Sequence, residues 1–457
     1  MEQGTGYTFD GKRVLVMGLG LHGGGLGAVK FLLDQGARVT VTDRRNAKDL
    51  LQPMRELESY AKKKKCDPIR FVIGTHRKKD FTAADYIVKN PGVRPDSPYL
   101  RASRKKGIPI LSDITLFFSS CPAPTIGVTG TRGKSTTAYL IAEFLKKHSR
   151  FRRVWLGGNI RRSVLEFLPR VKTGDIVVLE LSSFQLMDLG EIRKSPSIAV
   201  FTNLLNDHLN WHRTASEYAR AKSLIFAFQK PGDCVFIPSG DAALSRLVKR
   251  AKSHINRVSL PHEFARVVSQ NIGSHYISSA GLAVAVARHY KVPLVRIRAV
   301  LKRFKGMPSR QEEICVLRGI HFVNDTTATI PDAAIAALER FSAISARRGG
   351  KVILIAGGSD KKLQFRRFMQ IAKRRAKRVI FLPGDATRGM RRELRRLAAP
   401  GLPVFYASSM PEAVRIAAAH ASRGDTVLLS PGAASFGLFL NEFDRGEAFV
   451  HAVNRLS

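Results

Sequence analysis

The sequence has few cysteines, few tryptophans, a shortage of acidic residues and no long apolar run. Its four cysteines (Cys66, Cys121, Cys234 and Cys315) lie far apart and form no CxxC pair, which excludes a disulfide-rich scaffold and favours a reducing compartment. No stretch approaches the roughly 18 uninterrupted apolar residues that a membrane-spanning helix needs. The first residues lack a basic region followed by an apolar run, so we expect no secretory signal and a cytoplasmic protein.

The length and composition are those of a folded protein with several domains. At roughly 100–200 residues per domain, 457 residues predict two to four domains. The 44% hydrophobic and 25% charged residues exclude a wholly disordered or collagen-like chain.

Basic residues exceed acidic ones by 76 to 36, which gives a formal net charge of +40. Residues 308–457 carry 24 basic and 13 acidic side chains, so the excess is spread along the chain and not confined to a tail. The densest patch runs from residue 361 to residue 396. Two interpretations stay open, a solvated basic surface and a site for a polyanion, although no nucleic-acid-binding motif supports the second.

Three stretches in which apolar strands alternate with helical patterns follow one another. Strands are expected at residues 12–18, 39–42 and 86–88, then at 125–129, 176–179 and 198–201, then at 351–356, 379–382 and 426–429. This alternation predicts an α/β fold with parallel sheets that bind ligands at the carboxyl ends of their strands. We place the domains at residues 1–112, 113–307 and 308–457.

A glycine-rich loop, Gly18-Leu19-Gly20-Leu21-His22-Gly23, follows the first strand, and Asp43 ends the next strand. Glycines at this spacing let backbone N–H groups approach a phosphate, and an acidic residue at this distance suits a ribose hydroxyl. A tight turn without any ligand is the alternative. A nicotinamide cofactor and other nucleotide diphosphates fit this loop equally well.

A second glycine loop, Gly130-Thr131-Arg132-Gly133-Lys134-Ser135-Thr136, lies between a strand and a helix that we expect to begin near Thr136. Strict Walker spacing would place a glycine at Val128, so this loop is a variant. Its chemistry is still that of a triphosphate site, because backbone amides cradle phosphate, a lysine reaches the terminal phosphates and a serine hydroxyl binds Mg²⁺. We therefore predict that a nucleoside triphosphate and Mg²⁺ bind here.

Further oxygen ligands for such a metal are expected at the ends of neighbouring strands. Glu180 ends the strand at 176–179, and Asp207-His208 follows the strand at 198–201. The pattern alone does not distinguish a metal-ligating role from a structural role for these residues. Lys222, taken alone, has the sequence context of a cation on a helix surface.

Together these motifs resemble the Mur ligases, the ATP-dependent amide-forming enzymes of peptidoglycan precursor synthesis. The matching blocks keep their order along nearly the whole chain: TGTRGKST at 129–136, GGN at 157–159, LELSSFQL at 179–186, NDH at 206–208, EYARAK at 217–222, Asn324-Asp325, and LSP at 429–431 through Ala434-Ser435. The blocks GLGLHG and LELSSFQL are most similar to the members that add D-glutamate to UDP-N-acetylmuramoyl-L-alanine. The resemblance implies a Rossmann-like N-terminal domain for the UDP-sugar, a central P-loop ATPase domain and a Rossmann-like C-terminal domain for the amino acid.

The resemblance also implies a role for each matching residue. Gly130, Thr131, Arg132, Gly133, Lys134, Ser135 and Thr136, with Arg310 and Asp325, would bind ATP. Gly18, Leu21, His22, Asp43 and Asn159 would bind the UDP-substrate, and Lys361 and Ser435 would bind the amino acid. Lys134, His208 and Lys222 would be catalytic, and Ser135, Glu180, His208 and a carbamylated Lys222 would hold one or two Mg²⁺ ions.

Several residues depart from the family pattern. Arg132 replaces an asparagine, Thr327 replaces a lysine that approaches phosphate, and Tyr276 and Ser279 replace two asparagines. In the last block Gly437 replaces an aspartate and Glu442 replaces an aromatic residue. These changes leave the reaction type better defined than the amino-acid specificity.

The expected reaction begins when a substrate carboxylate attacks the γ-phosphate of ATP, and it ends when an amine displaces phosphate from the acyl phosphate. We expect a monomer that uses UDP-N-acetylmuramoyl-L-alanine and D-glutamate, with nucleic-acid binding only of a non-specific kind. Three alternatives stay open: a Mur-type or folylpolyglutamate-type ligase for another amino acid, an inactive basic paralogue that binds nucleic acid, and a nicotinamide oxidoreductase.

Overall fold

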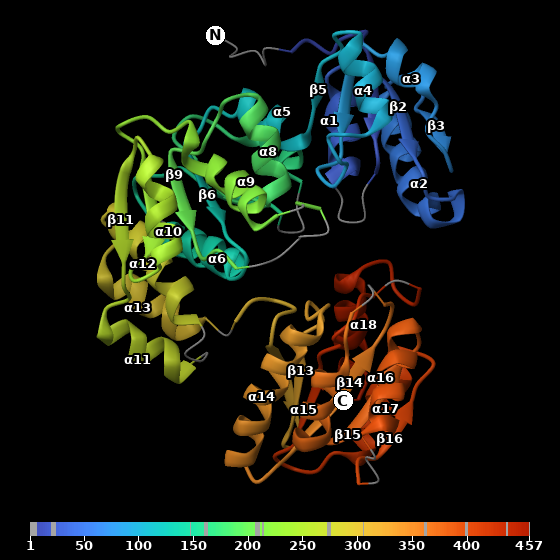
Figure 1. Cartoon of the computed structure of the whole chain (residues 1–457), viewed down its shortest axis with the longest axis vertical. Coiled ribbons are helices and arrows are strands. Elements are labelled where there is room, and N and C mark those ends of the chain that lie inside the picture. The colour runs from blue at the N-terminus through green and yellow to red at the C-terminus, as the bar shows by residue number, and fades with distance from the viewer. Residues whose placement is uncertain are drawn as a thin grey trace. The chain divides into compact units, whose positions relative to one another are not determined.

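The computed structural model describes residues 7–19, 24–146, 148–159, 163–205, 211–212, 214–271, 276–304, 306–360, 363–397, 401–435 and 437–456. The chain forms two compact units, residues 1–304 and 305–457. The first unit contains two sheets and the second contains one, and helices flank each sheet (Figure 1). Among the described residues, no helix has both the length and the apolar character that crossing a membrane requires.

The first sheet has the strand order β3-β2-β1-β4-β5, and its neighbouring strands are parallel. The order reverses between β1 and β4, so a ligand crevice is expected beyond the carboxyl ends of these two strands. Its elements are β1 (Arg13–Met17), α1 (Gly24–Asp34), β2 (Arg38–Asp43), α2 (Ala47–Lys64), β3 (Arg70–Ile73), α3 (Lys78–Ala83), β4 (Tyr86–Lys89), α4 (Pro98–Lys105) and β5 (Ile110–Leu111).

The second sheet has the order β11-β10-β9-β6-β8-β7 and is parallel as well. Every residue of β6, β8 and β9 is buried, as expected for strands covered on both faces. Its strands are β6 (Thr125–Thr129), β7 (Val154–Gly158), β8 (Ile176–Glu180), β9 (Ile198–Phe201), β10 (Cys234–Pro238) and β11 (His254–Val258). Its helices are α5 (Asp113–Ser120), α6 (Lys134–Leu145), α7 (Val164–Phe167), α8 (Ser183–Glu191), α9 (Ala215–Ala227), α10 (Ala242–Leu247), α11 (His262–Asn271), α12 (Ile277–His289) and α13 (Leu294–Arg303), with 3₁₀ turns η1 (Leu168–Arg170) and η2 (Val248–Arg250).

The third sheet makes up the core of the second unit and has the order β12-β13-β17-β14-β15-β16. Strands β12 and β13 pair antiparallel, and the other neighbours are parallel. Its elements are β12 (Glu312–Leu317), β13 (Ile320–Asn324), α14 (Pro331–Arg347), β14 (Val352–Gly357), α15 (Arg366–Arg375), β15 (Ala376–Leu382), α16 (Asp385–Arg396), β16 (Val404–Tyr406), α17 (Met410–His420), β17 (Thr426–Leu429) and α18 (Glu442–Asn454).

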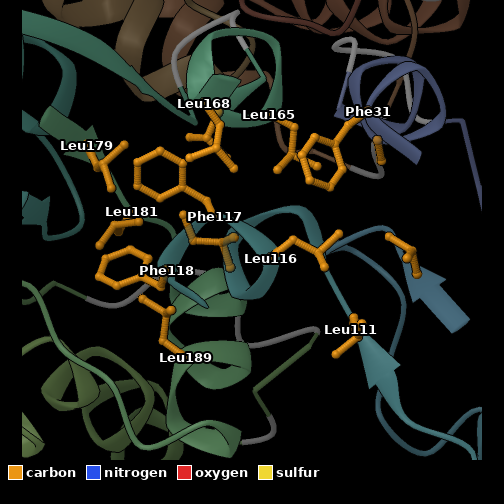
Figure 2. Packing of buried hydrophobic residues seen from close by; sticks show 14 of the residues in the cluster. Phe31, Leu111, Leu116, Phe117, Phe118, Leu165, Leu168, Leu179, Leu181 and Leu189 are labelled. Carbon is orange, nitrogen blue, oxygen red and sulfur yellow. The ribbon is translucent and has the colours of Figure 1, made fainter. Parts of the chain in front are cut away.

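One hydrophobic cluster joins the two sheets of the first unit. Figure 2 shows Phe31 of α1, Phe117 of α5 and Leu179 of β8 among its members. Helix α5 buries residues 113–118 without interruption, so it contacts apolar groups on more than one side. Burying each large apolar side chain stabilises the unit by roughly 1.5–3 kcal/mol, so this cluster fixes α5 firmly between the two sheets.

The expected α/β fold with parallel sheets and three domains is confirmed. The structure also contains strands that the sequence patterns did not reveal, such as the edge strands β3, β7, β11 and β16. The boundary between the two compact units falls at 304/305, and α5 begins at Asp113 directly after β5. The domain limits at 112/113 and 307/308 stay a prediction.

Candidate functional site

The second glycine loop turns sharply between β6 and α6, and its conformation requires glycine at two positions. Gly130 has φ +140° and Gly133 has φ +79°, both in the region that side chains other than glycine rarely adopt. A Cβ atom on Gly130 would lie 1.9 Å from the Oγ1 of Thr202. Helix α6 begins at Lys134, two residues before the expected start near Thr136, so the lysine already belongs to the first helical turn.

The segment after β9 holds this loop in place through the side chain of Asn203. The Nδ2 of Asn203 donates to the carbonyl of Arg132 (3.0 Å), and its Oδ1 accepts from the Arg132 N–H (2.9 Å). The Thr202 hydroxyl donates to the same carbonyl at 2.6 Å. The sequence patterns assigned no role to these residues, which lie about 70 positions from the loop, whereas the side chain of Arg132 itself is exposed.

The start of α6 is suited to bind a phosphate group. The first turn contains no acidic residue, and its free N–H groups carry the positive end of the helix dipole. Ser135 and Thr136 are buried there, and the Nζ of Lys134 donates to the carbonyl of Thr131 at 2.9 Å. The lysine ammonium therefore lies over its own loop, where it would face the terminal phosphates of a nucleotide.

Glu180, at the end of β8, lies beside this loop because β8 is the direct neighbour of β6. Its side chain is 2% exposed, and its Oε1 accepts from the Nδ2 of Asn159 at 3.1 Å. Its Oε2 is buried and has no hydrogen-bond partner among the described residues. A buried carboxylate oxygen without a partner is costly unless a cation satisfies it.

The donor set fits a Mg²⁺ ion that is held mainly by oxygen atoms of substrate and protein. Ser135 lies in the first turn of α6, which follows β6, and Glu180 ends the neighbouring strand β8; the Ser135 hydroxyl and the Glu180 Oε2 are both hard oxygen ligands. The described residues contain no cluster of three or more His, Cys, Asp or Glu that could hold a metal alone. Ligands from phosphate oxygens and water would therefore complete the coordination.

Lys222 in α9 is buried and not a surface cation, in contrast to its appearance in the sequence. Only 2% of it is exposed. Its Nζ donates to the carbonyl of Gly130 at 2.9 Å and lies 4.7 Å from the ring centre of Tyr218. The tertiary structure thus brings the ammonium of Lys222 against the backbone of the phosphate loop.

The first glycine loop is described as far as Leu19. Gly18 has φ +88°, and the N–H of Leu19 donates to the Oδ2 of Asp43 at 3.1 Å. Burial opposes ionisation of Asp43, but the hydrogen bonds and charge of Arg45 outweigh it and lower the pKa of this carboxyl. Asp43 is therefore a preorganised carboxylate at the end of β2, and Arg45 covers both of its oxygens.

In the second unit, Asp325 follows β13 and is fully surrounded by protein. Its Oδ2 accepts from the hydroxyl of Ser430 at 2.7 Å, and its Oδ1 accepts from the N–H of Gln311 at 3.2 Å. Burial raises the pKa of Asp325 to about 7, although these bonds and the charge of the nearby, exposed Arg310 oppose the rise.

The strand-end loop that contains Ser435 is fixed by a buried arginine that the sequence patterns missed. Arg445 in α18 is completely buried and donates to the carbonyl of Ala433 (3.1 Å) and to the carbonyl of Thr326 (2.8 Å). Burial lowers the pKa of Arg445 to about 10. Ser435 is 3% exposed and lies next to this anchored segment.

Four of the expected site residues lie outside the described residues: Leu21, His22, His208 and Lys361. The other expected residues fall into three groups, and Gly18 and Asp43 form the first of them, at the first glycine loop. The loop 130–136, Glu180, Asn159 and Lys222 lie together in the first unit, as their hydrogen bonds and strand pairings show. Arg310, Asp325 and Ser435 belong to the second unit.

The fold and these geometries define a multidomain α/β protein with a P-loop. Three family models match the chain: a Mur ligase MurD-like N-terminal domain at residues 12–112, a Mur ligase middle domain at 128–289 and a Mur ligase glutamate ligase domain at 309–432.

Curated relatives match the chain over almost its whole length. A UDP-N-acetylmuramoylalanine–D-glutamate ligase of Roseiflexus sp. (strain RS-1) is 41% identical, with 97% of this chain and 98% of the relative covered. The ligase of the same name from Borreliella burgdorferi is 34% identical, with 97% of each chain covered. The chain therefore belongs to the Mur ligase family.

Solved structures of lower sequence identity share the fold. The UDP-N-acetylmuramate–alanine ligase MurC of Thermotoga maritima aligns with a TM-score of 0.61 at 18% identity, covering 98% of this chain and 100% of that one. The MurF ligase of Thermotoga maritima in complex with ADP aligns with a TM-score of 0.54 at 15% identity, covering 100% and 98%.

Proposed function

We propose that this chain is the ATP-dependent ligase that joins D-glutamate to UDP-N-acetylmuramoyl-L-alanine in peptidoglycan precursor synthesis. The observation that carries the proposal is full-length similarity, at 33–41% identity, to several curated ligases of this name. The MurD-like N-terminal model and the glutamate ligase model support the same reaction at the two ends of the chain.

In this proposal ATP binds to the loop 130–136, where the α6 amides and Lys134 surround its phosphates. Ser135 and Glu180 would hold Mg²⁺, which would neutralise part of the negative charge of the phosphate groups when bound. The substrate carboxylate attacks the γ-phosphate in line, and ADP leaves from an acyl phosphate. Lys134 stabilises the charge that builds up on the transferred phosphoryl group.

The UDP-substrate is proposed to occupy the crevice beyond β1 and β4. The backbone at Gly18, with Leu21 and His22, would receive the uridine diphosphate, and Asp43 would accept from a ribose hydroxyl. Asn159 would reach the muramoyl group, since it projects from the end of β7 next to Glu180. The carboxyl group of the substrate would then lie close to the phosphate loop.

The second unit would supply the amine and complete the ATP site. Lys361 and Ser435 would hold the carboxylates of D-glutamate, and Arg310 and Asp325 would contact ATP. The amine attacks the acyl carbon, phosphate leaves with the bonding electrons of its C–O bond, and the amine loses a proton. Bringing the two substrates together is the main part of catalysis in such a reaction.

A second metal site is proposed at His208 together with a carbamylated Lys222. The ammonium of Lys222 is already desolvated against Gly130; after it loses a proton, the neutral amine would attack CO₂ and release a second proton, which gives a carbamate that can bind metal. After incubation with ¹³C-bicarbonate, a carbamate signal in the ¹³C NMR spectrum is expected for the natural chain and not for Lys222→Arg. Identical spectra would remove Lys222 from the metal site.

A cytoplasmic, monomeric enzyme is proposed, with any nucleic-acid binding limited to non-specific charge attraction. The decisive experiment is a phosphate-release assay with ATP, Mg²⁺ and UDP-N-acetylmuramoyl-L-alanine against D-glutamate, L-glutamate and L-lysine. D-Glutamate should be the preferred acceptor. Preference for another amino acid would keep the ligase chemistry and overturn the acceptor, and the absence of phosphate release with any amine would overturn the function.

A further inference from the structure

A groove of about 580 Å³ is lined by residues of the edge strand β11 and helix α12. Apolar side chains from β10, β11 and α12 make its floor, among them Phe236, Ile255 and Val284. Arg257 and Arg288 line it as exposed side chains. None of the described residues that line this groove is acidic.

The groove is separate from the proposed ATP site, although α12 takes part in both. Ser279, in the first turn of α12, faces the phosphate loop, where it would contact a Cβ on Gly133. The groove is lined by the later part of the helix, from Gly281 to His289. Arg288 lies nine residues after Ser279, which is about 14 Å along the helix axis.

A second hollow on the same unit differs from the groove in how its arginines are paired. That hollow, of about 400 Å³, is lined by Arg13, Arg38 and Arg70 from β1, β2 and β3. Each of these arginines forms an ion pair with an aspartate: Arg13 with Asp85 (2.8 Å), Arg38 with Asp67 (3.6 Å) and Arg70 with Asp80 (2.9 Å). By contrast, no described carboxylate lies within 4 Å of Arg257 or Arg288.

One further guanidinium group lies near the α12 end of the groove. The guanidinium of Arg150 lies 5.4 Å from the ring centre of Tyr290, next to His289. Burial lowers the pKa of His289, and the charges of Arg150 and His254 lower it further. Because no acidic side chain stands among the described lining residues, the potential at this end of the groove is positive, which favours an anion.

We propose that this groove binds a nucleotide-sized phosphorylated small molecule. Its phosphate would contact Arg257 and Arg288, and its apolar or aromatic part would lie over Ile255 and Ala285, which are partly exposed. The volume lies within the roughly 300–1,000 Å³ of ligand sites. A guanidinium group can donate two parallel hydrogen bonds to a phosphate. The neutral side chains that line the groove carry no positive charge and could not replace this interaction.

The test uses the full chain carrying Lys134→Ala, so that nucleotide binding at the phosphate loop is weakened. ADP and pyrophosphate are titrated calorimetrically into this protein, into its Arg257→Ser/Arg288→Ser derivative and into its Arg13→Ser/Arg38→Ser derivative. Both derivatives lose the same charge, but only the first loses arginines that have no carboxylate beside them. We expect saturable binding that weakens at least about tenfold in the groove derivative and less than about twofold in the control.

Hydrogen exchange of the natural chain with ADP locates the binding. Protection at residues 254–258 and 281–289, absent in Arg257→Ser/Arg288→Ser, is the expected result. The proposal is overturned by protection confined to the phosphate loop, by equal weakening in both derivatives, or by no saturable binding at concentrations of about 10 mM. This inference does not depend on the proposed ligase reaction, because its readout is binding and not turnover.

Discussion

Lys89 at the end of β4 and Asp188 in α8 form a buried ion pair in which Nζ lies 2.6 Å from Oδ1. Their side chains are only 4% and 6% exposed. Asp113, at the start of α5, is also buried. It lies close enough to this pair for the charges of both partners to act on its carboxyl group. The three residues join the carboxyl edge of the first sheet to helices that pack on the second, so a second buried carboxylate lies near the ion pair at this junction.

We predict that Lys89→Met destabilises the first unit by about 3 kcal/mol or more, because Asp188 would keep a buried charge without a cation. Thermal unfolding followed by tryptophan fluorescence reports this unit alone, since both tryptophans, Trp155 and Trp211, belong to it. The double variant Lys89→Met/Asp188→Leu should recover most of the loss, because it lacks both charges of the pair.

Arg104→Met provides the matched control for this ion pair. Arg104 reaches Glu191 of the same helix as Asp188 at 3.7 Å, but both side chains are substantially exposed. Its loss should cost less than about 1 kcal/mol. Equal losses of stability in Lys89→Met and Arg104→Met would show that the buried ion pair does not stabilise the junction more than an exposed pair does.

A second prediction concerns the pH dependence of stability. The pKa of Asp113 is raised to about 6, mainly by burial and also by the charge of Asp188, while a hydrogen bond from Ile114 and the charge of Lys89 oppose the rise. Between the unfolded pKa near 4 and pH 6 the folded state binds more protons, so this contribution is present below pH 4 and is lost as the pH rises through 6.

Asp113→Asn should therefore flatten the stability profile between pH 4 and 6 by up to about 3 kcal/mol, measured as the difference in unfolding free energy from the natural chain. The exposed Asp67→Asn is the control, and it should leave the slope unchanged. A slope that persists in Asp113→Asn would mean that another group takes up the proton.

The sequence patterns predicted those parts of the fold that have a local signal. The strands of the three sheet centres are short runs of buried β-branched and aliphatic residues, such as β6, β8 and β9, and each lies where it was expected. The phosphate loop was recognisable because its glycines, lysine and serine are adjacent in the chain.

The contacts that orient the site have no such signal. Asn203 hydrogen-bonds to Arg132 of the phosphate loop, 71 positions away in the sequence, and Lys89 forms an ion pair with Asp188, 99 positions away. The sequence around Lys222 is typical of a cation on a helix surface. Only the tertiary structure shows that its ammonium is buried against Gly130. The sequence patterns did not predict edge strands such as β11, because apolar and polar residues alternate only weakly along these half-exposed strands.

A third prediction tests the role of Lys134 in phosphate binding. Lys134→Ala should reduce ATP-dependent phosphate release roughly a hundredfold or more, because a positive group facing the transferred phosphoryl is removed. Lys146→Ala, at the other end of α6, should keep full activity, since this lysine is exposed and pairs with Glu143 of its own helix. Full turnover in Lys134→Ala would refute the assignment of the loop.

The last prediction compares two glycines that both have positive φ. Gly174 (φ +90°) has open space where the methyl group of an alanine would lie, whereas a Cβ on Gly130 would collide with Thr202 Oγ1. Gly174→Ala should therefore cost only the backbone strain of about 1 kcal/mol, with activity retained.

Gly130→Ala carries a comparable strain and must also displace the Thr202 hydroxyl from the carbonyl of Arg132. Because this bond orients the phosphate loop, a shift of about 1 Å is expected to lower phosphate release roughly a hundredfold. The assay is run below the unfolding midpoint of both variants, so that only folded protein is compared. Equal losses in the two variants would attribute the effect to strain alone, and an active Gly130→Ala would show that the phosphates do not bind where the loop leaves β6.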